Sequence, residues 1–331
     1  MKPERDNPFH QWVRLEQPRL GTRVVYATDD FFADKARLID QVEPVFIPDK
    51  YDDNGKWMDG WESRRKREPG HDYCIVRLGI RGVIRGFDID TRHFTGNFPP
   101  HASIDACASE DETPGDGADW REILPKVALM GDSHHFLAVD HVDAFTHLRL
   151  NIYPDGGVAR LRVYGEVRRD PNEFDDDAVI DLLALENGGR ALLCNDEHFG
   201  SMHNLNVPGR AVNMGDGWET ARRREPGNDW VILALGFPGV IEKVEIDTAH
   251  FKGNYPDRAA IQAAYLTDVD LEDLEFVSRN WPTLLQESKL DMDQQHYFTD
   301  KLNDVGTVSH VRLSIYPDGG VSRLRIFGRV A

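Results

Sequence analysis

Two loops of this chain carry carboxylates, guanidinium groups and a tryptophan in nearly the same order. Residues 59–73 read DGWESRRKREPGHDY and residues 216–230 read DGWETARRREPGNDW, with ten of fifteen positions identical at an offset of 157. Many apolar sequences can rebuild a β-core, whereas a loop that keeps Asp, Glu and two Arg in register is expected to bind something. Guanidinium groups recognise carboxylates, and side-chain carboxylates accept N–H bonds or move protons. The pattern therefore predicts a site for a small polar ligand.

Two further stretches repeat in the same order. Residues 93–97, HFTGN, return as residues 250–254, HFKGN, again at an offset of 157. Residues 147–165 return as residues 310–328 at an offset of 163, with fourteen of nineteen positions identical. The change of offset predicts a six-residue length difference in the loops between these stretches. The chain is interpreted as an N-terminal segment (1–22), a first repeat (23–168), an acidic linker (169–177) and a second repeat (178–331).

The apolar residues of each repeat indicate β-strands. Leu148, Leu150 and Ile152 alternate with polar neighbours, which is the period of two of a half-buried strand. The turn sequence at 154–157 and a second alternating run predict a β-hairpin that closes the domain. We expect an all-β chain of two tandem jelly-roll β-sandwich domains, similar to galactose-binding domains, with little helix. Further strands are expected at 73–80, 83–89, 230–235 and 240–246, and short helices at 175–185 and 268–278.

Charge and cysteine content limit the partners of the protein. Lys and Arg number 39 against 57 Asp and Glu, a net charge of −18, which repels nucleic acid and anionic membranes and excludes both as partners. A small anionic substrate then needs a local arginine pocket. Cys74, Cys107 and Cys194 are odd in number and widely spaced, which indicates reduced thiols in a cytoplasmic protein. No signal peptide or membrane span is recognised, and exposed strand edges favour a homo-oligomer.

The repeated motifs together identify a resemblance. The paired DGWE and RxREPGxD loops, the paired HFxGN motifs and the two YPDGGVxRLRxxG stretches resemble the allantoicase family, which is built from two such repeats. The resemblance covers nearly the whole chain after the first twenty or so residues. It implies a hydrolase of C–N bonds in linear amidines that converts allantoate and water to ureidoglycolate and urea in purine degradation. Allantoate is the expected partner, and no cofactor is expected to be required.

The implied reaction can be matched to the repeated side chains. The central carbon of allantoate carries a carboxylate and two ureido groups, so one ureido nitrogen can help to expel the other as urea. A general acid protonates the departing urea, and a base-activated water attacks the resulting acyliminium-like carbon. The catalytic candidates are His93, His250, Glu62 and Glu219, with His134 and His296 as a second acid–base pair, and the substrate-binding candidates are Asp59, Arg65, Arg67, Asn97, Asp216, Arg222, Arg224 and Asn254.

Structural explanations compete with these roles. The loop arginines and glutamates could form an ion-pair network that only ties the loop to the sheet. Trp61 and Trp218 are expected to be core anchors, because allantoate has no aromatic ring for them to stack on. The Gly-Asn pairs could serve only as turns. The two YPDGG stretches are interpreted as purely structural, since a repeated turn needs no ligand.

A metal site has weak support. The first repeat places six potential ligands within twelve residues, and the second keeps three of them. No HExxH, HxH or Cys-based ligand set occurs, so no metal is assigned and a divalent cation stays an alternative. His134 and His296 are aligned here by allowing one gap. The potential ligands are Asp132, His134, His135, Asp140, His141 and Asp143, and then Asp291, Asp293 and His296.

Two alternatives remain open from the sequence. The repeats differ, because Ala221 replaces Arg64, Asn228 replaces His71, and the first repeat has about ten extra residues in 43–56. Either one repeat is active, or the loops of both repeats build one composite site. Both arrangements would preserve the same residues. The alternative function is a non-catalytic tandem module that binds a carbohydrate or another ligand, since jelly rolls also serve that purpose. Such sites usually rely on exposed aromatic residues, and the repeated loops are dominated by Arg, Glu and His instead.

Overall fold

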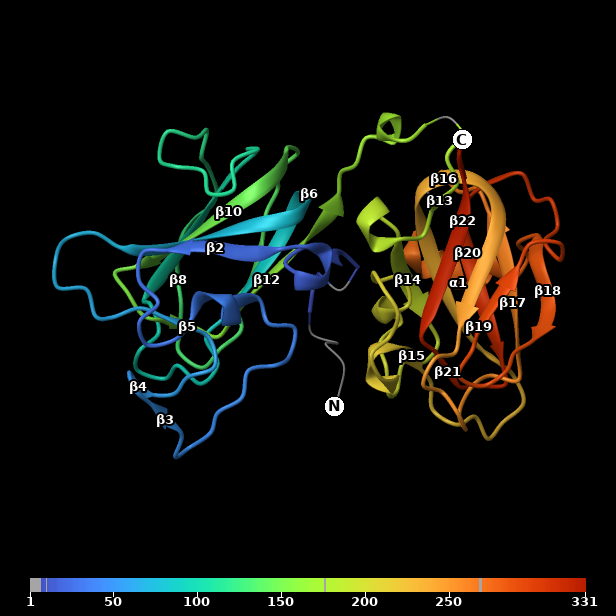
Figure 1. Cartoon of the computed structure of the whole chain (residues 1–331), viewed down its shortest axis with the longest axis horizontal. Coiled ribbons are helices and arrows are strands. Elements are labelled where there is room, and N and C mark those ends of the chain that lie inside the picture. The colour runs from blue at the N-terminus through green and yellow to red at the C-terminus, as the bar shows by residue number, and fades with distance from the viewer. Residues whose placement is uncertain (1–6, 10, 176, 268–269) are drawn as a thin grey trace. The chain divides into compact units, whose positions relative to one another are not determined.

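One long strand organises each repeat (Figure 1). The computed structural model describes residues 7–9, 11–175, 177–267 and 270–331. The chain separates into two compact units, Met1–Arg168 and Arg169–Ala331. Their long strands are β6 (Asp72–Asp90) and β16 (Asp229–Asp247), each of nineteen residues.

The two halves of β6 pair with different strands. Its first half pairs with β2 (Arg23–Ala27) and β10 (Ala144–Tyr153), and its second half pairs with β12 (Arg160–Val167) and β9 (Phe136–Ala138). The strand therefore runs from one layer of a sandwich into the other. The first layer continues from β10 to β7 (His101–Cys107) and β8 (Arg121–Ala128), and β1 (Val13–Arg14) flanks β12 in the second. All these pairings are antiparallel, which confirms the predicted β-sandwich.

The second unit repeats this arrangement around β16. Strand β16 pairs with β14 (Arg190–Cys194), β19 (Gln295–Phe298), β20 (Thr307–Tyr316) and β22 (Arg323–Val330). The sheet continues from β20 to β17 (Arg258–Ala264) and β18 (Thr283–Lys289). The remaining strands and the α-helix of the described residues are β3 (Tyr51–Asp52), β4 (Gly55–Lys56), β5 (Trp61–Glu62), β11 (Gly157–Val158), β13 (Ile180–Asp181), β15 (Trp218–Glu219), α1 (Leu271–Ser278) and β21 (Gly320–Val321).

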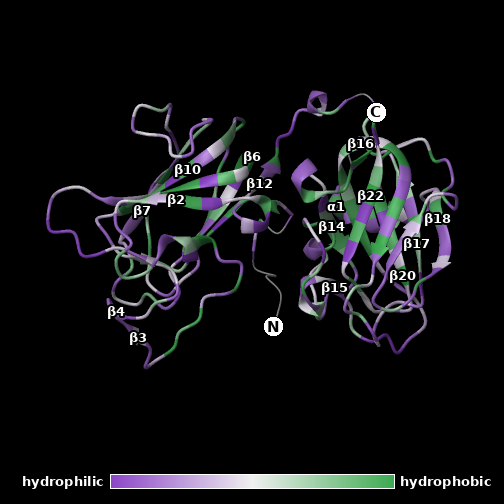
Figure 2. Ribbon diagram, in the orientation of Figure 1, coloured by the Kyte–Doolittle hydropathy of each residue, from purple (hydrophilic) through white to green (hydrophobic). Residues whose placement is uncertain are grey.

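The core follows the alternation in the sequence. Leu148, Leu150 and Ile152 are fully buried, as their period of two predicts. Figure 2 shows the corresponding alternation of apolar and polar residues along β16 and β22. Trp61 and Trp218 are also fully buried, and their indole N–H groups donate to the carbonyls of Asp29 and Asp196. The prediction that both tryptophans anchor the core is confirmed.

The predicted hairpin at the end of each repeat is wrong. Strands β10 and β12 pair with opposite halves of β6, so β6 lies between them in the sheet order. The turn at 154–157 is instead a crossover between the layers, and β11 within it pairs with β5. Alternation in both strands gives the same sequence pattern for a hairpin and for two strands in facing layers, because each buries one face. The pairs of strands expected at 73–89 and 230–246 are likewise single continuous strands.

The helix and loop predictions have mixed outcomes. Helix α1 confirms a short helix within 268–278, although residues 268 and 269 lie outside the described residues. The helix expected at 175–185 is wrong, because β13 lies there and only a short 3₁₀ turn follows at Leu185–Asn187; residue 176 is not described. The six-residue length difference between the repeats arises in two places. The residues that pair β7 with β8 and β17 with β18 show that the second repeat is four residues longer between these strands, where it has α1. The other two residues come after β18.

The predicted boundary segments have some structure of their own. The N-terminal segment contains β1 and a 3₁₀ turn at Pro18–Leu20, and residues 1–6 and 10 are not described. The acidic linker contains a 3₁₀ turn at Pro171–Glu173. Among the described residues, no helix has the length and apolar character needed to cross a membrane.

Gly156 sits where a side chain would collide with backbone. Its φ is +141°, and an added Cβ would lie 2.6 Å from Pro99 N and 2.8 Å from Asn97 O. We predict that Gly156→Ala lowers the free energy of unfolding by about 2 kcal/mol or more, from backbone strain and this clash. Gly115→Ala is the control, because its Cβ would have nothing within 4 Å. Denaturant titration of both variants measures the difference, and equal stability of the two would contradict this packing.

Candidate active site

Three segments far apart in sequence meet at one end of each sandwich. In the first unit, β5 carries Glu62 and pairs with β11 in the 154–157 turn, while Gly157 N donates to Asn97 O at 2.7 Å. In the second unit, β15 carries Glu219 and pairs with β21, and Gly320 N donates to Asn254 O at 2.8 Å. The charged loop, the HFxGN motif and the glycine turn therefore form one cluster in each repeat.

A carboxylate–amide pair lies at the centre of each cluster. Asn97 Nδ2 donates to Glu62 Oε1 at 2.7 Å, and Asn254 Nδ2 donates to Glu219. Glu62 is only 9% exposed, and this burial raises the pKa of its carboxyl group, although the hydrogen bond from Asn97 acts in the opposite direction. The structure thus brings together the two predicted residue types, Glu and Asn, and directs the Asn side chain to the carboxylate.

Successive residues of the charged loop alternate between inward and outward positions. Lys66 Nζ bonds to the buried Asp72 at 2.6 Å, and Arg223 pairs in the same way with the buried Asp229. The residues on either side are the predicted ligands Arg65, Arg67, Arg222 and Arg224. All four are exposed, and none makes a hydrogen bond or ion pair with another residue in the described part of the chain. The inward residue fixes the loop and leaves its neighbours free to bind an anion.

An aspartate of the glycine turn holds the same loop. Asp155 Oδ2 accepts the backbone N–H of Lys66 at 2.8 Å, and Asp318 Oδ2 accepts that of Arg223 at 2.9 Å. Neither aspartate is predicted as a site residue, because the sequence of the YPDGG stretches is that of a structural turn. The signal that could have found them is the unchanged PDGG sequence in both repeats.

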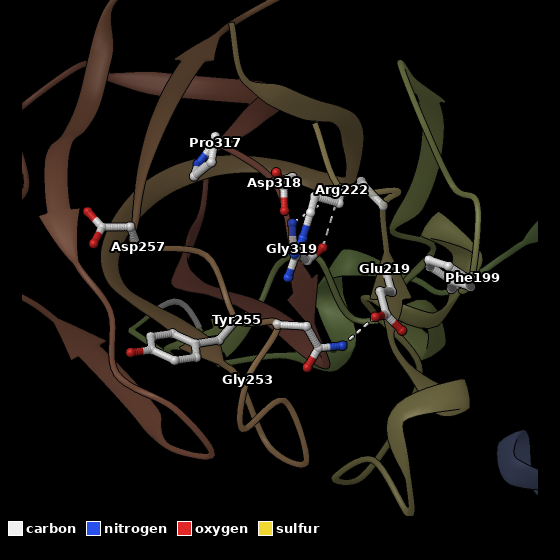
Figure 3. Close-up of a pocket in the computed structure, with 11 residues that line it drawn as sticks. Phe199, Glu219, Arg222, Gly253, Tyr255, Asp257, Pro317, Asp318 and Gly319 are labelled. Carbon is white, nitrogen blue, oxygen red and sulfur yellow. Dashed lines mark hydrogen bonds between the residues drawn. The ribbon is translucent and has the colours of Figure 1, made fainter. Parts of the chain in front are cut away.

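The cluster of the second unit opens into a pocket of about 430 Å³. That volume falls in the range of small-molecule sites, roughly 300–1,000 Å³. Figure 3 shows Glu219, Arg222 and Asp318 among its walls. Arg222 is a pocket residue, whereas Arg224 is not among those that line it. The lining residues are Phe199, Glu219, Thr220, Arg222, Gly253, Asn254, Tyr255, Asp257, Pro317, Asp318 and Gly319.

The predicted ligands Asp59 and Asp216 lie in a different environment. Asp59 Oδ2 accepts from Arg160 Nη2 at 2.9 Å and from Val45 N at 2.9 Å. Asp216 Oδ2 accepts from Arg323 Nη2 at 2.8 Å. Arg160 and Arg323 are almost completely buried. The structure therefore places both aspartates in ion pairs that attach the charged loop to the sandwich.

His93 and His250 occupy equivalent strained turns. Their φ angles are 69° and 70°, in the left-handed region, and their backbone N–H groups donate to Asp132 and Asp293 at 2.8 and 2.7 Å. Each ring donates from Nε2 to a backbone carbonyl, Pro44 O at 3.1 Å for His93 and Ala211 O at 2.9 Å for His250. In a neutral ring that bond leaves Nδ1 with the lone pair, so these histidines retain one basic nitrogen.

The alignment of His134 with His296 is wrong. His296 donates from Nδ1 to Ile246 O and accepts from Asp291 N at Nε2, and His135 makes the same two bonds with Ile89 O and Met130 N. His135 is therefore the partner of His296. Both nitrogens of each ring bond to backbone groups, which holds the ring in a structural position.

His134 has a different environment from this pair. Its Nδ1 bonds to Asp88 Oδ2 at 2.7 Å, and this bond raises the pKa of the ring despite partial burial. Its ring also stacks on Phe136. His134 is thus tied to a buried aspartate of β6, and the second repeat has no histidine at the equivalent place.

The potential metal ligands are dispersed. Asp132 bonds to the His93 backbone, His134 to Asp88, and Asp143 to Arg121 at 2.8 Å. Among the described residues, no group of three or more His, Cys, Asp or Glu side chains is arranged to hold a metal ion. The 132–143 segment therefore gives no coordination set in this structure.

Comparison with known proteins gives one consistent result. The family model described as "Allantoicase repeat" matches residues 13–168 and 180–331. A probable allantoicase of Photobacterium profundum is 58% identical over 320 residues, covering 97% of each chain. Probable allantoicase 1 of Burkholderia mallei is 57% identical, covering 96% of this chain and 94% of that one. The crystal structure of allantoicase from Saccharomyces cerevisiae matches with a TM-score of 0.82 and 36% identity, over 96% of this chain and 93% of that one.

The burial of Glu62 predicts a pH-dependent cost in stability. Because its folded-state pKa lies above the ordinary value of 4.5, Glu62 adds stability at pH well below 4.5, and this contribution is lost as the pH rises through the folded-state pKa. We predict that Glu62→Gln is more stable than the parent protein at pH 8 and that the difference shrinks toward pH 4.

Denaturant titration across this pH range checks the trend. Glu68→Gln is the control, because this carboxylate is exposed in the same loop. A Glu62→Gln protein that is no more stable than the parent at pH 8 would show that the native site does not penalise the charged carboxylate.

Proposed function

Because this chain belongs to the allantoicase family, we propose that its two loop clusters are where it hydrolyses allantoate to ureidoglycolate and urea. The activity itself follows from family membership over nearly the full length of the chain. The observation that supports the location is the meeting of an unpaired arginine, a carboxylate–amide pair and an aspartate in one pocket.

The pocket groups complement the substrate. Arg222 offers a guanidinium with no partner among the described residues, and this group can bind the substrate carboxylate with two parallel hydrogen bonds. Asp318 offers carboxylate oxygens and Glu219 a carboxyl oxygen that can accept ureido N–H groups, and the side-chain carbonyl of Asn254 offers a further acceptor. The protein carries a net charge of −18, so the local arginines are needed to hold an anion there.

We assign the proton transfers to the buried glutamate. A protonated Glu62 gives its proton to the departing ureido nitrogen as the C–N bond breaks, and the lone pair of the other ureido nitrogen stabilises the central carbon. The resulting Glu62 carboxylate then takes a proton from the attacking water, which restores the starting state. Burial favours the protonated form, which makes Glu62 suited to act first as the acid. Glu219 occupies the equivalent place in the second repeat.

The histidines of the HFxGN motif are the alternative bases. Each has its Nε2 on a backbone carbonyl and its Nδ1 available in the neutral ring. Their turns lie four residues before Asn97 and Asn254 in the sequence, although His250 is not among the residues that line the pocket. His135 and His296, by contrast, are assigned to the fold because both ring nitrogens bond to backbone.

We further propose that the protein is cytoplasmic, needs no metal and forms a homo-oligomer. Support for the cytoplasm comes from three free cysteines whose thiol pKa values are all raised by burial. Support for association comes from β8, which ends the paired order of its sheet. Sedimentation velocity measures the state of association directly, and a monomer at micromolar concentration would contradict that part.

The arginine assignment gives a graded prediction. The double variant Arg65→Ala/Arg222→Ala should lose roughly a hundredfold or more in kcat/KM for urea release from allantoate, mainly through KM, because a charged hydrogen-bonding group is removed. The matched double variant Arg67→Ala/Arg224→Ala removes the same charge from the same loops. It should lose much less, since Arg224 does not line the pocket. The reverse ranking of the two double variants would contradict the assignment.

A chelator tests the metal proposal. Urea release by the parent protein should be unchanged after dialysis against EDTA and unchanged on adding back divalent cations. A loss of activity that Mn²⁺, Mg²⁺ or Zn²⁺ restores would overturn it. If the untreated protein releases no urea from allantoate under any of these conditions, ligand binding without turnover becomes the leading function.

A further inference from the structure

We propose that each repeat contains a complete site for a ureido carboxylate, so that one chain binds two ligand molecules at two sites of unequal affinity. The inference rests on the proposed function, because it takes the ligand class from allantoate. It goes further by deciding between one active repeat, one composite site and two autonomous sites.

The bonds that build each cluster close within one compact unit. The contacts of Glu62, Asn97 and Asp155 have both partners in the unit that ends at Arg168. The contacts of Glu219, Asn254 and Asp318 have both partners in the unit that begins at Arg169. Among the described residues, these bonds therefore draw on no residue of the other unit.

The two clusters also agree in the contacts that fix their shape. The loop-to-aspartate bonds are 2.8 and 2.9 Å, and the glycine-to-asparagine backbone bonds are 2.7 and 2.8 Å. A Cβ on Gly156 would lie 2.8 Å from Asn97 O, and one on Gly319 would lie 2.6 Å from Asn254 O. Both glycine turns therefore pack equally closely against the segment that contains the Asn residue. Arg65 and Arg222 both remain unpaired within the described residues. The shared bonds belong to the fold of each repeat, and in both repeats they leave an exposed arginine beside them that is available to a ligand.

The surroundings of the clusters differ, which predicts unequal affinity. The pocket of the second repeat is lined by Tyr255, which supplies a hydroxyl, and by Asp257, a carboxylate that is paired with Lys289 and Arg258. The equivalent residues of the first repeat, at the same offset of 157, are Phe98 and Pro100, which supply neither.

The loop in front of the arginines differs as well. Arg64 is paired with Asp29 at 2.6 Å in the first repeat, whereas Ala221 stands at this position in the second and cannot make the pair. The recognition set is thus the same in both repeats, while its neighbours change the strength of binding.

Binding stoichiometry tests this inference directly. The probe is N-carbamoylglycine, which has one carboxylate and one ureido group on a carbon with no second nitrogen, so it cannot expel urea by the allantoate route. We expect isothermal titration to give two molecules per chain. Arg65→Ala and Arg222→Ala should each give one, and the double variant should give none. Arg279→Ala is the control, because this exposed arginine pairs with Glu275 on α1 and should leave the stoichiometry at two.

Other outcomes overturn the inference in recognisable ways. One molecule per parent chain, lost completely in either single variant, would mean one composite site. One molecule per chain, lost in only one single variant, would mean one binding repeat, and no binding by the parent protein would exclude both sites. Urea release from allantoate is measured in parallel. Two bound molecules without urea release would refute the proposed reaction but not the two sites.

Discussion

The site depends on a buried arginine that ties the charged loop to the sandwich in each repeat. Arg160, at the start of β12, is 1% exposed and donates to the Asp59 carboxylate, the Asp59 carbonyl and the Val42 carbonyl. Arg323 does the same with Asp216 and neighbouring carbonyls in the second repeat. A buried ion pair contributes little net stability, but breaking one leaves an uncompensated charge, so the loop has one strongly preferred position. Glu62 and Glu219 follow these aspartates by three residues and take their place from them.

The rest of the cluster uses this fixed loop. The inward Lys66 or Arg223 bonds to a buried aspartate of the long strand, and the turn aspartate takes the backbone N–H of the same residue. These contacts leave the flanking arginines without partners in the described structure. Burial of the Glu62 carboxyl group lowers stability for the sake of binding, a trade that is common in functional sites. Most of the polar contacts of the site therefore serve to position the glutamate and the flanking arginines.

Much of this could be predicted from sequence because the chain contains two copies of one domain. The duplication singled out the charged loops, and the alternation at 148–152 predicted strands and a sandwich correctly. The pairing of those strands could not be predicted, since alternation is the same for a hairpin and for strands in facing layers. Which loop residues point inward was equally inaccessible. Lys66 and Arg65 are both basic, and only the position of buried Asp72 separates them.

The histidines illustrate the same limit. A one-residue uncertainty in alignment paired His296 with His134, although hydrogen bonds to backbone make His135 its partner. Likewise the Asp155 and Asp318 roles follow from bonds to a loop about ninety residues away in sequence. The repeated motifs indicated the chemistry, and three-dimensional contacts were needed to assign it to atoms.

The most direct test is an experimental structure of the protein with N-carbamoylglycine bound. We expect the ligand carboxylate on the guanidinium of Arg222, with ureido N–H groups on Glu219 or Asp318. A ligand bound away from this pocket, with Arg222 making no contact to its carboxylate, would contradict the central claim that the repeated loops form the substrate site.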